Sequence, residues 1–356
     1  MSKDQEKVDL SINPNSDAVT NVTLDKSDSH VQHTRHDKRG KSKRGRRSPV
    51  IAHGVLLIDK PKGLSSFDVI RELRRATGVK KMGHTGTLDP MATGLLVICL
   101  GEATKLVPYL TADDKGYEAE VTFGVTTDTY DAEGDITHQA HIDQLQSLRQ
   151  SSVVDQLTNF MGAQLQRPPA FSAIRVNGER LYDKARRGEK VDVPLRSVTF
   201  HHLELTRWSS VDVEDMSEAS LSFPKAEVTV ICSKGTYIRS LAFDLGAVLG
   251  CGAHLSALRR TQAGHFKLNE AHDLKSVTSE NLSRVLTPLA EALPQAPKVT
   301  LNAAEVLAVQ QGKVISAPNL DPSDVGVYRG ISTEGRLIAL LKKEGAQLKV
   351  ARGFKG

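Results

Sequence analysis

Cysteine is scarce in this sequence, and its pattern argues against two kinds of small stabilised domain. Only three cysteines occur in 356 residues, and no two of them form a Cys-x-x-Cys pair. An odd number of widely spaced cysteines disfavours both a disulfide framework and a zinc knuckle. We therefore expect the protein to work in a reducing compartment.

The sequence also lacks long apolar runs. The longest, Leu95–Leu100, is far too short to span a bilayer, and the N-terminal segment is polar, without the apolar core of a signal peptide. The sequence therefore predicts a soluble, cytoplasmic protein that does not enter a membrane.

The bulk composition is that of a folded protein with a modest positive charge. The chain is 39% hydrophobic and 25% charged, and its formal net charge is +5. Its length suits one large domain and one small one. A charge of this size is compatible with a polyanionic partner but does not require one.

Residues 1–49 differ in composition from the rest of the chain. They contain almost no aromatic or clustered aliphatic residues, and they end in a basic block between His36 and Arg47. Such a segment cannot bury enough surface to fold, so we expect a disordered basic tail. The block either aids solubility or follows a phosphate backbone as an electrostatic arm, and the sequence leaves both readings open.

Globular patterning starts at residue 50. Gly54–Ile58 is a short apolar run closed by a turn, which predicts a buried strand. Ser66 is expected to cap a helix that ends at Gly78.

Later segments carry the patterns of further strands and a helix. Tyr117–Phe123 alternates between apolar and polar residues, which indicates a half-buried strand. Residues 226–232 predict a second strand, and residues 238–249 carry apolar residues at helical spacing. The proline-bounded, basic segment 166–194 is typical of an exposed loop, and residues 296–356 predict short strands joined by turns.

The most unusual stretch runs from Gly83 to Gly94 and is rich in glycine and threonine. It would hold His84 and Asp89 near the end of a buried strand, where rigid scaffolds commonly present reactive groups. On these residues alone, an aspartate such as Asp89 is usually a turn former, and a histidine such as His84 is more often a hydrogen-bonded loop residue than a catalyst. The stretch does not end in the Gly-Lys-Ser or Gly-Lys-Thr of a phosphate loop, and no further cluster at ligand spacing supports a metal site.

This stretch resembles the catalytic signature of the TruB family of tRNA pseudouridine-55 synthases. The resemblance covers about residues 53–270. Two mild departures are Thr87, where alanine is common, and the Ile-Arg pair ending at Arg175, where Leu-Lys is usual. Other segments are similar to the family's motifs and occur in the expected order: Gly54–Gly63, Asp114–Tyr117, Ser172–Tyr182, Cys232–Arg239 and Gly252–Arg260.

The resemblance implies an α+β fold, with a pseudouridine synthase catalytic domain built on a mixed, mainly antiparallel β-sheet flanked by helices. We expect this domain over residues 50–295, with an RNA-gripping insertion at about 163–195. Residues 296–356 would form a small β-rich, PUA-like RNA-binding module. The protein is expected to be a monomer.

The resemblance also assigns roles to single residues. It places the catalytic carboxylate on Asp89, and Arg239 would keep that carboxylate ionised in a dry site through a charge-assisted pair. The positions that match substrate contacts are His84, Tyr117, Tyr237 and Leu258. The positions expected to grip the RNA backbone are Arg175, Arg180, Lys184, Arg186, Arg187, Arg259 and Arg260.

The implied reaction is the isomerisation of uridine to pseudouridine in the TΨC loop of tRNA, at position 55. The target uridine would be flipped out of its stack. Because nothing is oxidised and no group is donated, no cofactor or metal is expected. Whether Asp89 attacks the base, attacks the sugar or promotes elimination remains open.

Two other functions are compatible with parts of this sequence. A guide-RNA-dependent synthase shares the catalytic motifs but resembles this chain less over residues 163–195, so a stand-alone enzyme without guide RNA is favoured. A non-catalytic tRNA chaperone would not need an intact Asp89, Tyr117 and Arg239.

Overall fold

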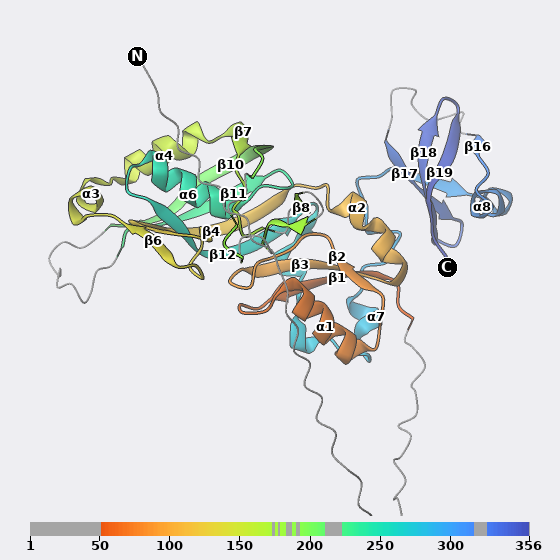
Figure 1. Cartoon of the computed structure of the whole chain (residues 1–356). Coiled ribbons are helices and arrows are strands. Elements are labelled where there is room, and N and C mark those ends of the chain that lie inside the picture. The colour runs from red at the N-terminus through yellow and green to blue at the C-terminus, as the bar shows by residue number, and fades with distance from the viewer. Residues whose placement is uncertain are drawn as a thin grey trace, which may run out of the picture. The chain divides into compact units, whose positions relative to one another are not determined.

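The computed structural model describes residues 51–172, 175–176, 179–182, 187–189, 193–210, 223–316 and 326–355. The chain divides into two units, Met1–Arg47 and Ser48–Gly356, and all described residues belong to the second (Figure 1). The predicted disordered tail, residues 1–49, lies outside the described residues and stays a prediction. No helix in the described part of the chain is long and apolar enough to cross a membrane.

A ten-stranded sheet dominates this unit, in the order β14-β1-β3-β12-β4-β11-β10-β7, with β2 paired to β3 and β13 paired to β12. The β1–β14 and β3–β12 pairs are parallel, and the other pairs are antiparallel. The expected mixed, mainly antiparallel sheet is therefore confirmed. Its strands are β1 (Gly54–Lys60), β2 (Met82–His84), β3 (Thr93–Leu100), β4 (Lys115–Phe123), β7 (Gly162–Gln166), β10 (Arg196–Ser209), β11 (Lys225–Cys232), β12 (Ala253–Ala263), β13 (Phe266–Lys267) and β14 (His272–Asp273).

Helices flank this sheet, as expected from the sequence. Helix α4 contacts β10, α6 contacts β12, and α4 and α6 contact each other, so both cover one face of the sheet (Figure 1). A small hairpin, β5 with β6, extends from the same region. The elements are α1 (Ser66–Thr77), α2 (Val107–Leu110), α3 (Ile142–Ser147), α4 (Gln150–Asn159), α6 (Ile238–Val248), α7 (Leu282–Val285), β5 (Val125–Thr127) and β6 (Ile136–Gln139).

Strand β3 is buried on both faces. Leu96 and Ile98 pack into one apolar cluster, whereas Leu95 and Val97 pack into another. Each such side chain, once fully buried, stabilises the fold by about 1.5–3 kcal/mol. The strand that follows the glycine-rich loop is therefore a rigid base for it.

The predicted helix near the N-terminus of the domain is present, but its cap is the preceding serine. The side chain of Ser65 accepts a hydrogen bond from the Asp68 backbone N–H and completes a capping box, and Gly78 ends the helix with a φ of 77°. The expectation that Ser66 is the cap was wrong. Its hydroxyl is buried and bonds the backbone of Leu88 instead.

The C-terminal residues form a separate five-stranded sheet in the order β15-β17-β18-β19-β16. Tyr328, Ile338 and Leu341 are buried in its core. The expected small β-rich module is therefore present. Its elements are β15 (Lys298–Leu301), α8 (Ala303–Gln310), β16 (Ile315–Ser316), β17 (Val327–Ser332), β18 (Leu337–Glu344) and β19 (Gln347–Gly353).

Candidate active site

The loop between β2 and β3 carries Asp89 and is tied down along its length. The Ser66 hydroxyl accepts from the Leu88 N–H at 2.8 Å and donates to the Leu88 carbonyl oxygen at 3.1 Å. The Gly63 N–H donates to the Pro90 carbonyl oxygen at 2.8 Å. Both neighbours of Asp89 are therefore fixed, which restricts where its carboxylate can point.

Arg260 on β12 holds the other part of this loop. Its guanidinium donates to the carbonyl oxygens of Gly86 at 3.1 Å, Thr87 at 3.4 Å and Leu95 at 2.7 Å. The loop re-enters the sheet at Gly94, where φ is +95° and an added Cβ would lie 2.4 Å from the Arg260 carbonyl oxygen. Only glycine fits this close approach without strain.

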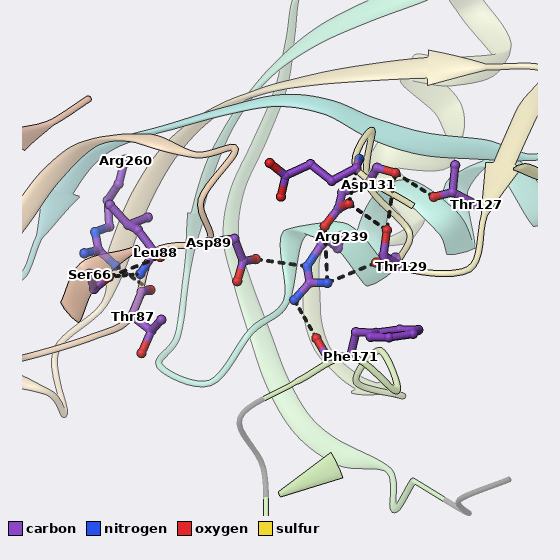
Figure 2. Close-up of polar contacts among 11 residues, drawn as sticks. Ser66, Thr87, Leu88, Asp89, Thr127, Thr129, Asp131, Phe171, Arg239 and Arg260 are labelled. Carbon is purple, nitrogen blue, oxygen red and sulfur yellow. Dashed lines mark hydrogen bonds and ion pairs between the residues drawn. The ribbon is translucent and has the colours of Figure 1, made fainter. Parts of the chain in front are cut away.

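The carboxylate of Asp89 points toward Arg239, near the start of α6 (Figure 2). The Arg239 Nε lies 3.0 Å from Asp89 Oδ2, and its Nη1 lies 3.3 Å from Asp131 Oδ2. Arg239 is 6% exposed and also donates to the carbonyl oxygens of Thr129 and Phe171, each at 3.0 Å. One buried arginine therefore joins two carboxylates and is held in place by two backbone groups.

Asp131 is a further residue of this site that the sequence motifs did not indicate. It is 4% exposed, and its Oδ1 accepts from the Thr129 hydroxyl at 2.6 Å and from the Glu133 N–H at 3.0 Å. Tyr130, between them, has a φ of 64°, which is rare for a non-glycine residue. The signal in the sequence is the run of alternating threonine and aspartate residues after β5, whose side chains favour local hydrogen bonding.

Desolvation by burial raises the pKa of the Asp89 carboxyl above its usual range. Arg239 and Lys60 oppose this rise, whereas the negative charge of Asp131 adds to it. The ionised form of Asp89 therefore depends on the cations around it, with Arg239 the most important.

Asp89 lies in the wall of a cavity of about 280 Å³. This volume is at the small end for ligand pockets, which span about 300–1,000 Å³, so it suits one small flat group. The structure brings together six of the residues singled out from the sequence, which line this cavity: Asp89, Tyr117, Tyr237, Arg239, Leu258 and Arg260.

The two tyrosines reach the cavity from β4 and from the start of α6. Tyr117 on β4 is buried, which raises the pKa of its hydroxyl, while its interaction with Arg260 opposes that rise. Tyr237 caps α6, and its backbone exchanges two hydrogen bonds with the Gln166 side chain, at 2.8 and 3.0 Å. Gln166 therefore sets the position of Tyr237, a role that no sequence motif indicates.

His84 lies at the end of β2 and is not among the residues that line the cavity. Its Nδ1 is buried without a hydrogen-bond partner among the described residues. Burial lowers the pKa of His84, and the nearby Arg260 lowers it further.

The basic residues expected at the RNA backbone occupy different environments. Arg259 forms a two-point pair with Asp59, at 2.7 and 3.1 Å, beside a second hollow of about 640 Å³. Arg260 is only 2% exposed, and its guanidinium donates to the loop carbonyl oxygens.

The other basic residues come from the segment after β7. The backbones of Arg175 and Arg180 pair in register on β8 (Arg175–Val176) and β9 (Glu179–Arg180). Arg187 is exposed and pairs with glutamates on either side of it in the sequence. Lys184 and Arg186 lie outside the described residues.

Metal binding finds no support in the part of the chain that the structure describes. No group of three or more His, Cys, Asp or Glu side chains there could hold a metal ion. The described site consists of the Asp89 carboxylate, paired with a buried arginine in the wall of a small cavity.

Comparison with protein families identifies the class. Residues 74–238 match the model of the TruB family pseudouridylate synthase N-terminal domain, and residues 239–294 match that of the tRNA pseudouridylate synthase B C-terminal domain. The chain belongs to the TruB family of pseudouridylate synthases. The family expected from the sequence motifs is thereby confirmed.

Curated relatives match over most of their length. A protein of Corynebacterium diphtheriae named tRNA pseudouridine synthase B is 39% identical over 83% of this chain and 94% of its own. A protein of Thermobifida fusca with the same name is 40% identical over 86% of this chain and 100% of its own.

Solved structures share the fold. A chain in a Cbf5-Nop10-Gar1 complex has a TM-score of 0.62 and 24% identity, with 85% of each chain covered. A chain in an H/ACA ribonucleoprotein bound to a substrate RNA containing 2′-deoxyuridine has a TM-score of 0.61 and 23% identity, covering 85% of this chain and 86% of that one. At this identity the likeness concerns the fold.

Proposed function

We propose that this enzyme converts uridine to pseudouridine at position 55, in the TΨC loop of tRNA, with Asp89 as the nucleophile. The observation that carries the proposal is the Asp89 carboxylate, 3.0 Å from Arg239 in the wall of a cavity sized for one small ring. The names of the relatives, tRNA pseudouridine synthase B, supply the substrate class.

The local charges suit a carboxylate that must stay ionised while water is excluded. A flipped uracil in the cavity would desolvate Asp89 further, which favours the protonated form. Arg239 opposes this effect through a charge-assisted contact and is itself held by the Thr129 and Phe171 carbonyl oxygens. It therefore needs little rearrangement when the base enters.

The cavity walls suit a flipped base. The Tyr117 ring and the Leu258 side chain offer apolar surface to a planar ring. Removing a base from its stack costs a few kcal/mol, and contacts in the pocket offset this cost. His84, at the end of β2, contacts the RNA loop once that loop has opened.

The remaining assignments follow the same proposal. Residues 50–295 form the catalytic domain, residues 163–195 within it grip the RNA, and residues 296–356 form the PUA-like RNA-binding module. Backbone contacts come from Arg175, Arg180, Lys184, Arg186, Arg187, Arg259 and, less directly, Arg260. The enzyme acts as a monomer without guide RNA, in the cytoplasm, and its affinity for tRNA falls as salt rises.

The test is to incubate the purified protein with an unmodified tRNA transcript and no guide RNA, then map pseudouridine by carbodiimide-dependent reverse-transcription stops. We expect one stop, in the TΨC loop, that disappears when the transcript carries cytidine at position 55. A stop that arises only after guide RNA is added would contradict the stand-alone assignment. Tight binding with no stop at all would point to a tRNA chaperone.

A further inference from the structure

Two buried cations in the cavity wall have no ion-pair partner among the described residues. Lys115 is 7% exposed, and its Nζ donates to the Asp113 carbonyl oxygen at 2.6 Å. Arg260 is 2% exposed, and its guanidinium donates to three backbone carbonyl oxygens of the loop. A buried cation is normally paired directly with a carboxylate, whereas Lys115 interacts with Asp113 and Asp114 without forming an ion pair, so positive charge is left at the cavity.

The two cations lie together, beside the loop that carries Asp89. Lys115 is on β4 and Arg260 on the neighbouring β12, where Arg260 faces Tyr117 in register. A Cβ added at Gly86 would lie 3.5 Å from the Arg260 Nη1 and 4.0 Å from the Lys115 Cε. Arg239, by contrast, forms ion pairs with two carboxylates. The cavity is therefore positive on the Lys115 side.

We infer that Lys115, supported by Arg260, binds a carbonyl oxygen of the target uracil and stabilises the negative charge on the base while its bond to ribose is broken. This inference rests on the proposed function and names a further catalytic residue for it. No role for Lys115 followed from the sequence motifs, although it stands two residues before Tyr117.

The charge follows from the chemistry of the reaction. When the N1–C1′ bond breaks, its electron pair stays on N1 and spreads to the two carbonyl oxygens of uracil. C1′ is either captured by the Asp89 carboxylate or loses the neighbouring 2′ proton to it. The new bond then forms from C5 to C1′, C5 gives up its proton and N1 gains one. Asp89 releases C1′ in the first route, or returns the proton to C2′ in the second, so atoms and electrons balance.

One fixed hydrogen-bond donor can bind the uracil both before and after the base rotates. Rotating uracil by half a turn about the line through N3 and C6 exchanges N1 with C5, and it exchanges the two carbonyl oxygens as well. A donor that holds one oxygen before the turn therefore meets the other afterwards. A lysine ammonium suits this task, because it is a compact charge with rotatable donors.

The electrostatic surroundings of Lys115 agree with such a role. Burial lowers the pKa of Lys115 to about 8, and the like charge of Arg260 adds to this, whereas Asp113, Asp114 and Cys232 oppose it. The ammonium is therefore still charged at neutral pH but poorly hydrated. A poorly hydrated cation interacts more strongly with a charge that develops beside it.

The test compares Lys115→Met with wild type in single-turnover reactions on two tRNAs, one with uridine and one with 5-fluorouridine at the target position. Fluorine stabilises the uracil anion, so the base leaves with less help. The readout is the disappearance of the original nucleoside after nuclease digestion. We expect a loss of roughly 100-fold on uridine, a smaller loss on 5-fluorouridine, unchanged tRNA affinity and partial rescue by Lys115→Arg.

The matched control is Lys60→Met. Lys60 is 0% exposed and, like Lys115, donates to backbone carbonyl oxygens, but it is not among the residues that line the cavity. Any loss caused by Lys60→Met should be equal on the two substrates, because Lys60 acts through the loop and through the ionisation of Asp89 and does not touch the departing base. If Lys115→Met fails to fold, Lys115→Gln carries the same comparison.

A wild-type rate for Lys115→Met, or an equal loss on both substrates, would overturn the inference and leave Lys115 a structural residue. Failure of the wild-type protein to convert either substrate would instead contradict the proposed function. The two failures are thus distinguishable in one experiment.

Discussion

The two arginines of the cavity wall are both buried but differ in their partners. Arg239 contacts the carboxylates of Asp89 and Asp131, whereas Arg260 donates to the backbone of the loop. The first arrangement acts on the ionisation of Asp89, and the second acts on the shape of the loop and leaves positive charge in place. Burial alone therefore does not tell what an arginine does in a site.

The largest effect on rate is expected from Arg239→Met. Without the guanidinium, burial and the charge of Asp131 both raise the pKa of Asp89, so less of the carboxylate is ionised. We predict a loss on the order of 10³-fold in single-turnover rate, with the acid limb of the pH–rate profile moved to higher pH. The protein should remain folded by circular dichroism. A near-normal rate with an unmoved acid limb would remove Arg239 from this role.

Arg260→Met should act mainly on stability. It would leave the carbonyl oxygens of Gly86 and Leu95 without their donor in a buried site, which costs about 1–3 kcal/mol for each group. We predict a lower free energy of unfolding in urea, by about 3 kcal/mol. Arg260→Lys, which keeps the charge but has fewer hydrogen-bond donors, should recover part of the lost free energy of unfolding. Unchanged stability in Arg260→Met would break the contrast with Arg239.

A smaller effect is expected from Asp131→Asn, which removes the charge and preserves the size of the side chain. Because Asp131 raises the pKa of Asp89, its neutralisation should move the acid limb of the rate profile to lower pH. Arg239 would lose one of its anchors, so the rate at neutral pH should fall by roughly tenfold. An acid limb that moves upward would show that Asp131 acts on Asp89 only through the position of Arg239.

Much of this site could be predicted from local patterns. The alternation of Tyr117–Phe123 and the apolar spacing after Ile238 gave the elements that carry Tyr117 and Arg239, and both are observed as β4 and α6. The motifs around Asp89 identified the family. The roles of single residues and the domain boundaries stay predictions.

Two features could not be predicted from the sequence. One is the register between strands that lie far apart in the chain, and the other is which of two identical adjacent residues takes a given role. Arg259 and Arg260 are adjacent, and strand alternation sends one outward to Asp59 and the other inward, opposite Tyr117. A buried arginine without an ion pair runs against the usual preference, so the sequence favoured exposure for both. The choice between Ser65 and Ser66 as helix cap was of the same kind.

Asp131 escaped notice for a related reason. Its contact with Arg239 joins the segment after β5 to α6, and nothing local marks the pair. Gln166, which fixes the backbone of Tyr237, is another long-range contact of this type.

The central claim, that Asp89 performs the chemistry, is tested most directly by Asp89→Asn and a tRNA transcript labelled with tritium at C5 of uridine. The proton on C5 is lost to water only when the base is rejoined through carbon, so tritium release reports the isomerisation itself. We predict that the wild type releases tritium from one uridine per tRNA, while Asp89→Asn binds the tRNA with similar affinity and releases none. Release at a comparable rate by Asp89→Asn would contradict the account.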